Sequence, residues 1–163
     1  NFICTHNSRR SHLSQLAMAA ALAYFGIEGV TSWSGGTEVT AFHPNAIAAL
    51  QRAGFAIEQG EGNNPHYRVS YAALGPVLIG FSKTYNDPVN PQRDFAAIMT
   101  CSDADEHCPL IAGADFRLAL TYEDPKIADG TPGETTKYDA TLRQISSELL
   151  LVCSIIDNQL TTR

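Results

Sequence analysis

The sequence lacks an excess of basic residues, because 17 Asp and Glu outweigh 11 Lys and Arg and give its 163 residues a formal charge of −6. Affinity for nucleic acid rests on neutralising phosphates, so a general nucleic-acid binder is not expected. No apolar run reaches the roughly 18–20 residues that a membrane span needs. No charged and apolar leader with a cleavage site opens the chain either. We therefore expect neither nucleic acid nor a membrane as a partner.

Charged residues and cysteines are also scarce. Charged residues make up only 17% of the chain and hydrophobic residues 44%, which predicts a globular chain with a well-buried body. The length predicts a single domain over residues 1–163, long enough to bury a core without staples. Four cysteines and no leader favour a reducing, cytoplasmic compartment.

Acidic residues are missing from the beginning of the chain, where Glu28 is the first. Arg9, Arg10, His6 and His12 all precede it. An acidic protein with such a beginning is expected to carry a local positive site. That charge suits a small anionic ligand better than a polyanion.

Along the sequence, short apolar runs that are typical of strands alternate with segments whose apolar residues have helical spacing. This alternation is typical of an α/β fold. We expect a mostly parallel, four-stranded, doubly wound sheet with an inserted β-hairpin, the insertion covering residues 58–94 approximately. The expected elements are a strand ending at Cys4, a helix Ser11–Phe25, a strand Gly29–Trp33 before a turn at 34–36, a helix Pro44–Ala53, a hairpin of Tyr67–Tyr71 and Val77–Phe81, strands Phe95–Met99 and Arg117–Tyr122, and a helix from Thr135 to about Leu160.

The segment that carries chemistry is Cys4–Ser11, a Cys-x5-Arg-Ser loop between the first strand and the first helix. A loop that wraps back on itself points successive backbone N–H groups inward and makes an anion nest. The following helix adds the positive end of its dipole. Arg10 supplies a planar fork that matches two oxygens of a tetrahedral oxyanion.

Cys4 at the base of this loop is the expected nucleophile. The positive field favours its thiolate, and a thiolate below a bound oxyanion is placed to attack the central atom in line. Ser11 can donate its hydroxyl proton to that thiolate. The alternative interpretation of Cys4 is a buried structural thiol at a strand end.

These residues resemble the phosphate loop of the low-molecular-weight protein tyrosine phosphatases and of their relatives, the thioredoxin-coupled arsenate reductases. The segment Thr100–Pro109 resembles the reductase redox segment, in which two cysteines stand seven apart and the second precedes proline. Tyr122–Pro125 resembles the Asp-Pro loop whose acid faces the phosphate loop. The resemblance also covers Trp33–Gly36 and Pro44–Gly54.

The resemblance implies that the chain reduces arsenate to arsenite without a metal or organic cofactor. Cys4 would attack the arsenic, Cys101 would resolve the adduct, and Cys108 would free Cys4 by forming a Cys101–Cys108 disulfide for thioredoxin or a similar protein. Asp124 would help to move the proton at the leaving oxygen. The expected oxyanion-binding residues are Thr5, His6, Asn7, Ser8, Arg9, Arg10 and Ser11.

Four residues depart from the family pattern. His6 stands where the loops usually have Gly, and Arg9 where these reductases often have Cys. Gln15 replaces a common Glu, which puts the family's monovalent-cation site in doubt. Lys126 replaces the aromatic residue that tyrosine phosphatases of this fold usually carry, which weakens that interpretation.

Other functions stay open at this point. A phosphatase acting on phosphotyrosine or small phosphomonoesters would use Cys4, Arg10 and Asp124 in the same roles. A non-catalytic oxyanion-binding module is a third hypothesis, although the intact catalytic set argues against it. Zinc binding by Cys101, His107 and Cys108 is disfavoured because no Cys-x2-Cys pair exists. Cys153 is expected in the core, and His43 and His66 on surface turns.

The spacing of the two redox cysteines makes a geometric prediction. On an intact helix, seven residues separate Cα atoms by about 10.5 Å, whereas a disulfide needs about 4.4–6.8 Å. Cys108 precedes Pro109, which disfavours the α conformation there. We expect Thr100–Pro109 to be partly helical when reduced and to unwind on oxidation.

Overall fold

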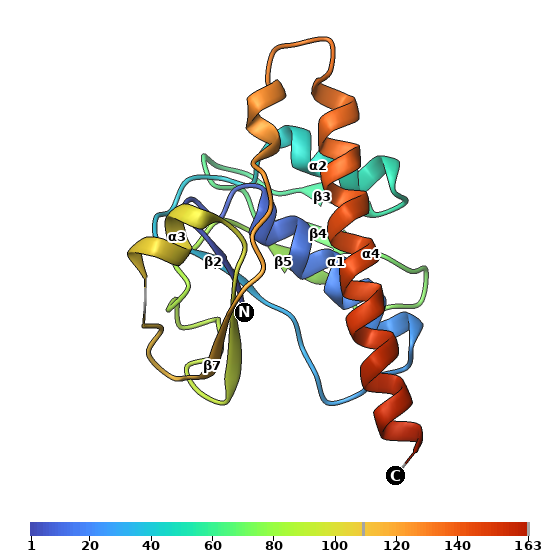
Figure 1. Cartoon of the computed structure of the whole chain (residues 1–163). Coiled ribbons are helices and arrows are strands. Elements are labelled where there is room, and N and C mark those ends of the chain that lie inside the picture. The colour runs from blue at the N-terminus through green and yellow to red at the C-terminus, as the bar shows by residue number, and fades with distance from the viewer. Residues whose placement is uncertain (109, 163) are drawn as a thin grey trace.

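The computed structural model describes residues 1–108 and 110–162 of the chain (Figure 1). Pro109 of the expected redox segment lies outside these residues. In chain order the elements are β1 (Phe2–Cys4), α1 (Arg10–Tyr24), β2 (Ser34–Gly36), α2 (Pro44–Arg52), β3 (Ala56–Gln59), β4 (Tyr67–Ser70), β5 (Leu78–Gly80), β6 (Phe95–Met99), α3 (Ser102–His107), β7 (Ala114–Ala119), a 3₁₀ turn (Pro125–Ala128) and α4 (Glu134–Thr161).

The central sheet has four parallel strands in the order β2-β1-β6-β7. Phe2 lies opposite Ser34 on one side and Ile98 on the other, and Ile98 lies opposite Leu118. The predicted four-stranded parallel sheet is confirmed. Because β1 is an inner strand, its carboxyl end and the loop that follows lie at the middle of the sheet, where parallel sheets bind ligands.

The two faces of the sheet are covered by different elements, since successive strand residues point to opposite sides. Phe2 and Ile98 belong to the larger core, beneath α1 and α4. Ile3 and Met99 belong to a second cluster, which includes Ala104 of α3. The helices therefore lie on both sides, as expected for a doubly wound sheet (Figure 1).

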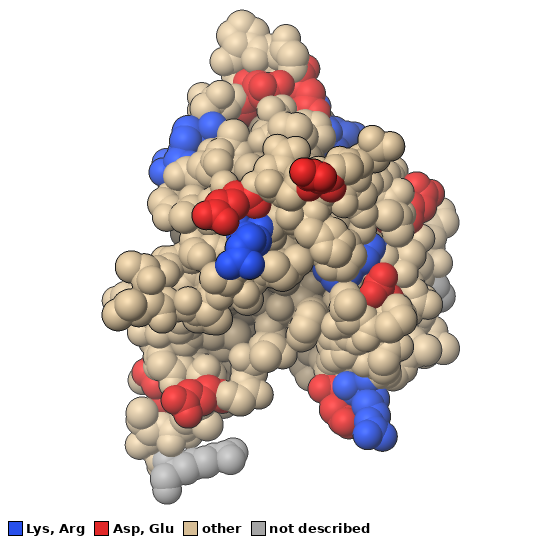
Figure 2. Space-filling model, turned by 180° about the vertical axis from the view of Figure 1, so that it is seen from behind, with Lys and Arg blue, Asp and Glu red and all other residues tan. Residues whose placement is uncertain are grey.

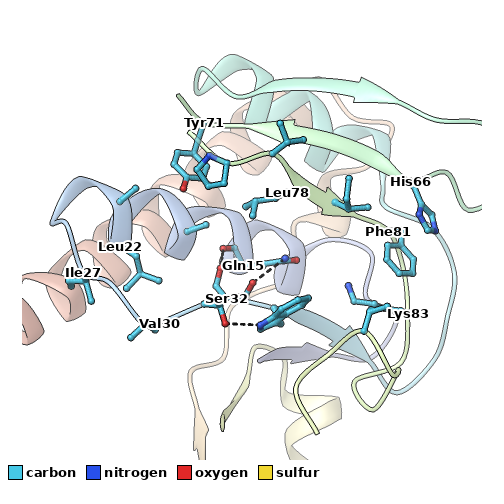
Figure 3. Close-up of a pocket in the computed structure, with 18 residues that line it drawn as sticks. Gln15, Leu22, Ile27, Val30, Ser32, His66, Tyr71, Leu78, Phe81 and Lys83 are labelled. Carbon is cyan, nitrogen blue, oxygen red and sulfur yellow. Dashed lines mark hydrogen bonds between the residues drawn. The ribbon is translucent and has the colours of Figure 1, made fainter. Parts of the chain in front are cut away.

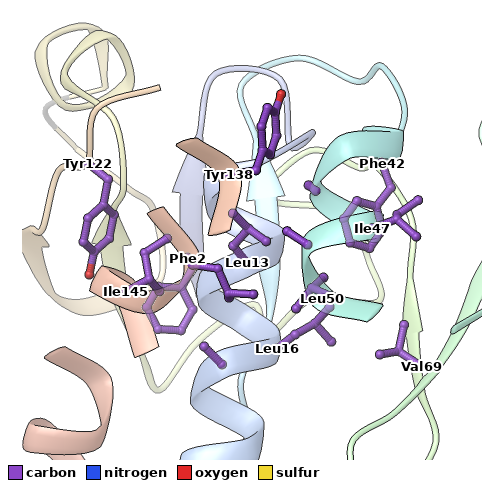
Figure 4. Close-up of a cluster of buried hydrophobic side chains, with 14 of the residues drawn as sticks. Phe2, Leu13, Leu16, Phe42, Ile47, Leu50, Val69, Tyr122, Tyr138 and Ile145 are labelled. Carbon is purple, nitrogen blue, oxygen red and sulfur yellow. The ribbon is translucent and has the colours of Figure 1, made fainter. Parts of the chain in front are cut away.

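The larger core explains the positions of α1, α2 and α4 (Figure 4). Leu13 and Leu16 of α1 are fully buried against Leu50 of α2 and Ile145 of α4. Buried residues of α4 recur every three or four positions over a helix of 28 residues, as its sequence pattern predicts. Pro44 occupies the first turn of α2, where its missing N–H costs nothing.

A second, antiparallel sheet has the strand order β3-β4-β5. The predicted hairpin is confirmed as β4 and β5, with Val69 opposite Leu78. The third strand, β3, was not predicted. The buried residues of this sheet are Tyr67 and Val69 of the central strand β4 and Gly80 of β5. Three of the four β3 residues are exposed. A strand with so little buried surface leaves little hydrophobic alternation in the sequence.

The prediction for the second parallel strand was wrong, because the strand lies at Ser34–Gly36 and not at Gly29–Trp33. The two glycines are needed for close packing and not for a turn. A Cβ on Gly35 would lie 2.3 Å from the Tyr85 backbone, and one on Gly36 would lie 2.7 Å from both Asn7 N and Thr5 O. Glycine here lets the strand approach the phosphate-loop segment.

The last parallel strand also begins earlier than predicted, at Ala114 instead of Arg117. Gly113, with φ +82°, turns the chain directly before it, and Ala114 then pairs with Phe95. Four of the six residues of this edge strand are exposed, Phe116 and Leu118 among them. The hydrophobic pattern alone therefore placed its beginning poorly.

Charged side chains form no single large patch on the face seen in Figure 2, where Lys and Arg lie among Asp and Glu. Within residues 1–108 and 110–162, no helix is both long enough and apolar enough to cross a membrane.

Candidate functional site

The loop between β1 and α1 is held from outside through its carbonyl oxygens. Thr5 O accepts hydrogen bonds from Thr37 and Glu38, His6 O from Thr40 and Ser82, and Ser8 O from His43 N. Within the described residues, the backbone N–H groups of residues 6–10 have no protein acceptor outside regular helix bonding. Helix α1 also begins without a side-chain cap. The loop therefore offers a group of inward N–H donors suited to an anion.

Asn7 gives the loop its sharp bend. Its φ is 43°, in the left-handed region that Asn tolerates better than most residues. Its side chain is fully buried and is fixed at both ends, since Oδ1 accepts from Lys83 N at 2.9 Å and Nδ2 donates to Ser11 Oγ at 2.8 Å. Asn7 thus connects the loop to the first turn of α1 and to residue 83.

Cys4 lies at the carboxyl end of β1, 4% exposed, with its sulfur 3.1 Å from Ser11 Oγ. Because Ser11 Oγ already accepts a hydrogen bond from Asn7, its own proton is free to point at the sulfur. The nearby amide donors and the amino end of α1 add positive potential. The Cys4 sulfur therefore faces a hydroxyl donor and a region of positive potential.

Arg10 connects the loop to the Asp-Pro segment. Its guanidinium donates to Tyr122 O at 2.9 Å and to Asp124 Oδ2 at 2.7 Å. The second oxygen of Asp124 accepts from Lys126 N. Both side chains of the ion pair are largely buried, which strengthens their attraction. The structure therefore brings Cys4, Arg10 and Asp124 to one place, as the sequence predicted.

Arg9 points its side chain away from the loop interior. Its guanidinium donates to Tyr138 Oη at 2.7 Å and to Asp129 at 2.9 Å. Burial raises the pKa of Asp129, but the Tyr138 hydrogen bond and the charge of Arg9 outweigh burial and leave that pKa below its ordinary value. Of the expected oxyanion-binding residues, Arg9 is thus placed to contribute a backbone N–H and not its side chain.

Two histidines expected to add positive charge have other surroundings. His12 is fully buried, stacks on Phe42 at 4.0 Å and lies 3.2 Å from Ser34 Oγ. Burial, together with the charge of Lys83, holds the pKa of His12 well below its usual value, so this imidazole is neutral. His12 therefore adds no charge to the positive site expected at the beginning of the chain. His6 is exposed beside Glu38, at 3.5 Å.

Cys101 reaches the loop from the neighbouring strand. It is completely buried after β6, and its sulfur lies 3.4 Å from Thr5 Oγ1. It also caps α3 by accepting from Ala104 N. Cys108 ends the same helix in a non-helical conformation, with φ −122° and ψ 70°, and is half-buried. The predicted partial helix between the two cysteines is confirmed.

Arg117 of β7 holds the redox segment against the sheet. It donates to Cys108 O at 3.0 Å and to Asp105 O at 2.6 Å, and it pairs with the Asp105 carboxylate at 2.5 Å. Three contacts from one side chain fix both the last turn of α3 and the backbone of Cys108.

The remaining candidates have structural surroundings. Cys153 is buried against Met18, as expected for a core residue. Gln15 donates to Ser32 O at 3.3 Å, and its Oε1 is buried with no partner in the described residues. His66 is exposed on a loop, whereas His43 caps α2 and lies 3.9 Å from Asp129. Residues 1–108 and 110–162 contain no cluster of three His, Cys, Asp or Glu placed to hold a metal.

Comparison with known proteins agrees with this geometry. The chain is 29% identical over 136 residues to an arsenate reductase of Bacillus licheniformis, covering 82% of this chain and 78% of the relative. The solved arsenate reductase of Archaeoglobus fulgidus superposes with a TM-score of 0.59 at 17% identity over 94% of this chain and 97% of that one. A low-molecular-weight phosphotyrosine phosphatase of Vibrio cholerae gives 0.58 at 15% identity over 97% and 94%.

The chain has the low-molecular-weight phosphatase fold. The predicted resemblance to arsenate reductases and phosphatases of this fold is thereby confirmed, although no protein-family model matches the sequence. In this fold the loop after β1, the segment after β6 and the Asp-Pro segment after β7 all follow parallel strands. Their meeting at one edge is a consequence of strand direction.

Sequence reasoning missed four residues that complete the phosphatase-like site. Lys83 holds Asn7, Asp129 and Tyr138 hold Arg9, and Arg117 holds Cys108. The signal for Tyr138 was its place on the apolar face of the last helix, which indicated only a core residue. Lys83 and Asp129 lie in loops whose approach to the site depends on tertiary packing.

Proposed function

We propose that this protein is a thiol-dependent arsenate reductase. The observation that carries the proposal is the pair of buried cysteines at one loop, since Cys101 Sγ lies 3.4 Å from Thr5 Oγ1 and Cys4 lies at the base of the same loop. A phosphatase needs one such thiol, whereas reduction of an oxyanion by two electrons needs two. The similarity to a curated arsenate reductase supports the same function.

The substrate is a tetrahedral oxyanion, arsenate or its close analogue phosphate. Inward N–H groups of the loop and the Arg10 guanidinium supply the donors, and the amino end of α1 adds positive potential. The proposed oxyanion-binding residues are Thr5, His6, Asn7, Ser8, Arg9, Arg10 and Ser11, with Arg9 acting through its backbone.

In the first step the Cys4 thiolate attacks arsenic and forms a sulfur–arsenic bond, and a hydroxide or water leaves. Ser11 stabilises the thiolate before attack, because its hydroxyl proton points at the sulfur. Asp124, which accepts a hydrogen bond from Arg10, is our proposal for the group that transfers a proton to the leaving oxygen.

In the second step Cys101 attacks the sulfur of Cys4. The sulfur–arsenic bond breaks, its electron pair reduces As(V) to As(III), and arsenite leaves while a Cys4–Cys101 disulfide forms. Cys108 then attacks Cys101, which frees Cys4 and leaves a Cys101–Cys108 disulfide. One disulfide thus forms for each two-electron reduction.

The last disulfide needs an external thiol reductant, for which thioredoxin or a similar dithiol protein is our proposal. The relay needs no metal or organic cofactor. It works only where all three cysteines are kept reduced between turnovers, so we propose a cytoplasmic location.

The second candidate function is a phosphatase for phosphotyrosine or small phosphomonoesters. The contact between Arg10 and Asp124 favours it, because a thiolate, an arginine and a carboxylic acid together suffice for phosphate-ester cleavage. Cys101 and Cys108 would then only protect Cys4 by reversible oxidation.

The test measures arsenate-dependent oxidation of NADPH with thioredoxin and thioredoxin reductase, beside hydrolysis of an aryl phosphate. Cys108→Ser is compared with Cys153→Ala, a matched loss of a thiol in the core. We expect Cys108→Ser to lose multiple-turnover reduction and to keep the wild-type phosphatase activity, and Cys153→Ala to keep both.

If Cys108→Ser loses both activities together while remaining folded, Cys108 is structural and the relay is wrong. If wild type hydrolyses the aryl phosphate but does not oxidise NADPH with arsenate, the protein is a phosphatase.

A further inference from the structure

A cavity lies between α1 and the antiparallel sheet, with no residue of the loop 4–11 in its lining (Figure 3). Its volume is about 640 Å³, within the range of small-molecule sites. Helix α1 forms one wall, β5 another, and the segment that leads into β2 a third. Most of the side chains that line the cavity are apolar. They include Leu22, Ile27, Trp33, Leu78 and Phe81.

The only charged side chain lining the cavity in the described residues is that of Lys83. This side chain is 2% exposed, and its ammonium has no hydrogen-bond or ion-pair partner among those residues. It lies over the Phe81 ring, 4.6 Å from the ring centre. A largely buried ammonium with only an aromatic ring as its partner is costly, and a stable fold normally pairs such a group.

The charge of this ammonium persists at neutral pH. Burial lowers the pKa of Lys83 to about 8, and the charge of Asp87 acts in the opposite direction. No Asp or Glu is among the lining residues in the described parts of the chain, and His66 stacks on Phe81. The cavity therefore has one cationic end and no anion of its own.

The geometry of the cavity matches a molecule with one anionic end and an apolar body. In Figure 3, Lys83 lies at one end with Phe81 and His66, while Leu22, Ile27 and Val30 lie at the other. Several apolar side chains near the rim are exposed to 40–50%, including Val30, Ile79 and Val89. A bound alkyl chain would cover this surface.

We propose that this cavity binds a monocarboxylate with an apolar body, such as a medium-chain fatty acid, with its carboxylate on Lys83 and its chain along α1. A single ammonium balances the one negative charge of a carboxylate, and the apolar walls suit an alkyl body. None of the loop residues 4–11 lines the cavity, although the backbone N–H of Lys83 donates to Asn7 of that loop.

Calorimetric titration at pH 7 tests this with octanoate and with 1-octanol, which has the same chain and no charge. Wild type should bind octanoate more tightly than 1-octanol. Lys83→Met, which keeps an apolar stem, should weaken the affinity for octanoate at least tenfold. It should change the affinity for 1-octanol less than about threefold. Lys126→Met removes an exposed lysine outside the cavity and should leave both affinities unchanged.

A second variant covers the case in which Lys83→Met does not fold. Ala19 lines the cavity from α1 and is only half-buried, so Ala19→Phe should fill the cavity and weaken octanoate and 1-octanol alike. Saturating phosphate, which occupies the loop, should leave octanoate binding unchanged. Displacement of octanoate by phosphate, equal binding by Lys83→Met and wild type, or no binding by wild type would overturn the proposal.

Discussion

At the scale of single residues, we predict that the reactivity of Cys4 depends on the hydrogen-bond chain from Asn7 through Ser11. Asn7 donates to Ser11 Oγ at 2.8 Å, and Ser11 Oγ lies 3.1 Å from the Cys4 sulfur. We predict that Ser11→Ala slows alkylation of Cys4 by iodoacetamide at pH 7 about tenfold, because a hydrogen bond to a charged group is lost. Mass spectrometry of the labelled peptide gives the rate.

Ser14→Ala is the matched control for this change. Ser14 lies one turn further along α1, is fully buried and has no hydrogen-bond partner for its hydroxyl in the described residues. In Ser14→Ala, Cys4 should be alkylated at the wild-type rate. An unchanged rate in Ser11→Ala would show that Ser11 does not stabilise the thiolate.

Burial of Lys83 lowers its pKa, so the free energy of unfolding should rise with pH. Its folded pKa of about 8 lies below the ordinary value of 10.5, so between these values the unfolded chain binds more protons. The free energy of unfolding therefore gains up to about 3 kcal/mol from this group as pH rises from 8 to 10.5. Lys83→Met should lack this gain.

Urea unfolding of wild type and Lys83→Met at pH 7 and pH 10 measures the effect. Relative to wild type, the free energy of unfolding of the variant should be higher at pH 7 than at pH 10. A difference between the two proteins that is the same at both pH values would contradict an ammonium buried at this place.

At the scale of elements, α3 is the part that the proposed relay must rearrange. Its six helical residues separate Cys101 from Cys108, and Arg117 holds its last turn through Asp105 and Cys108 O. Seven residues on a helix span about 10.5 Å, which is longer than the Cα separation of any disulfide. Formation of the Cys101–Cys108 bond therefore requires the helix to unwind.

Hydrogen exchange over Ser102–His107 should rise when the Cys101–Cys108 disulfide forms, while strands β1 and β6 stay protected. The unwound segment would expose the disulfide to its reductant. Equal protection in reduced protein and in a sample shown by mass to carry this disulfide would mean that α3 does not switch.

The same scale shows what the sequence can predict. Helices α1, α2 and α4 were predicted to within a residue or two, because each buries residues at helical spacing or carries a clear proline start. Strand β2 was misplaced because its three residues, Ser34–Gly36, look like a turn. Their strand conformation comes from pairing with β1, which local sequence does not encode.

At the scale of the whole molecule, the site is assembled from segments far apart in the sequence. The spacing of Cys4 and Arg10 predicted the loop, and the resemblance to the phosphatases and reductases implied that Asp124 and Cys101 would approach it. The contacts of Arg9 with Asp129 and of Asn7 with Lys83 could not be predicted, because they depend on how α4 and the inserted segment pack. A single domain over residues 1–163, with its insertion near 58–94, stays a prediction.

The central claim is that the disulfide passes from Cys4–Cys101 to Cys101–Cys108, so that the electrons which reduce arsenic come from the cysteine thiols. It is tested most directly by treating Cys108→Ser with one equivalent of arsenate and no external reductant, then mapping its disulfides by peptide mass spectrometry. The account predicts a Cys4–Cys101 disulfide and one equivalent of arsenite, and a Cys101–Cys108 disulfide in wild type. Arsenite formed while Cys101 stays a free thiol, or no arsenite at all from folded protein, would contradict it.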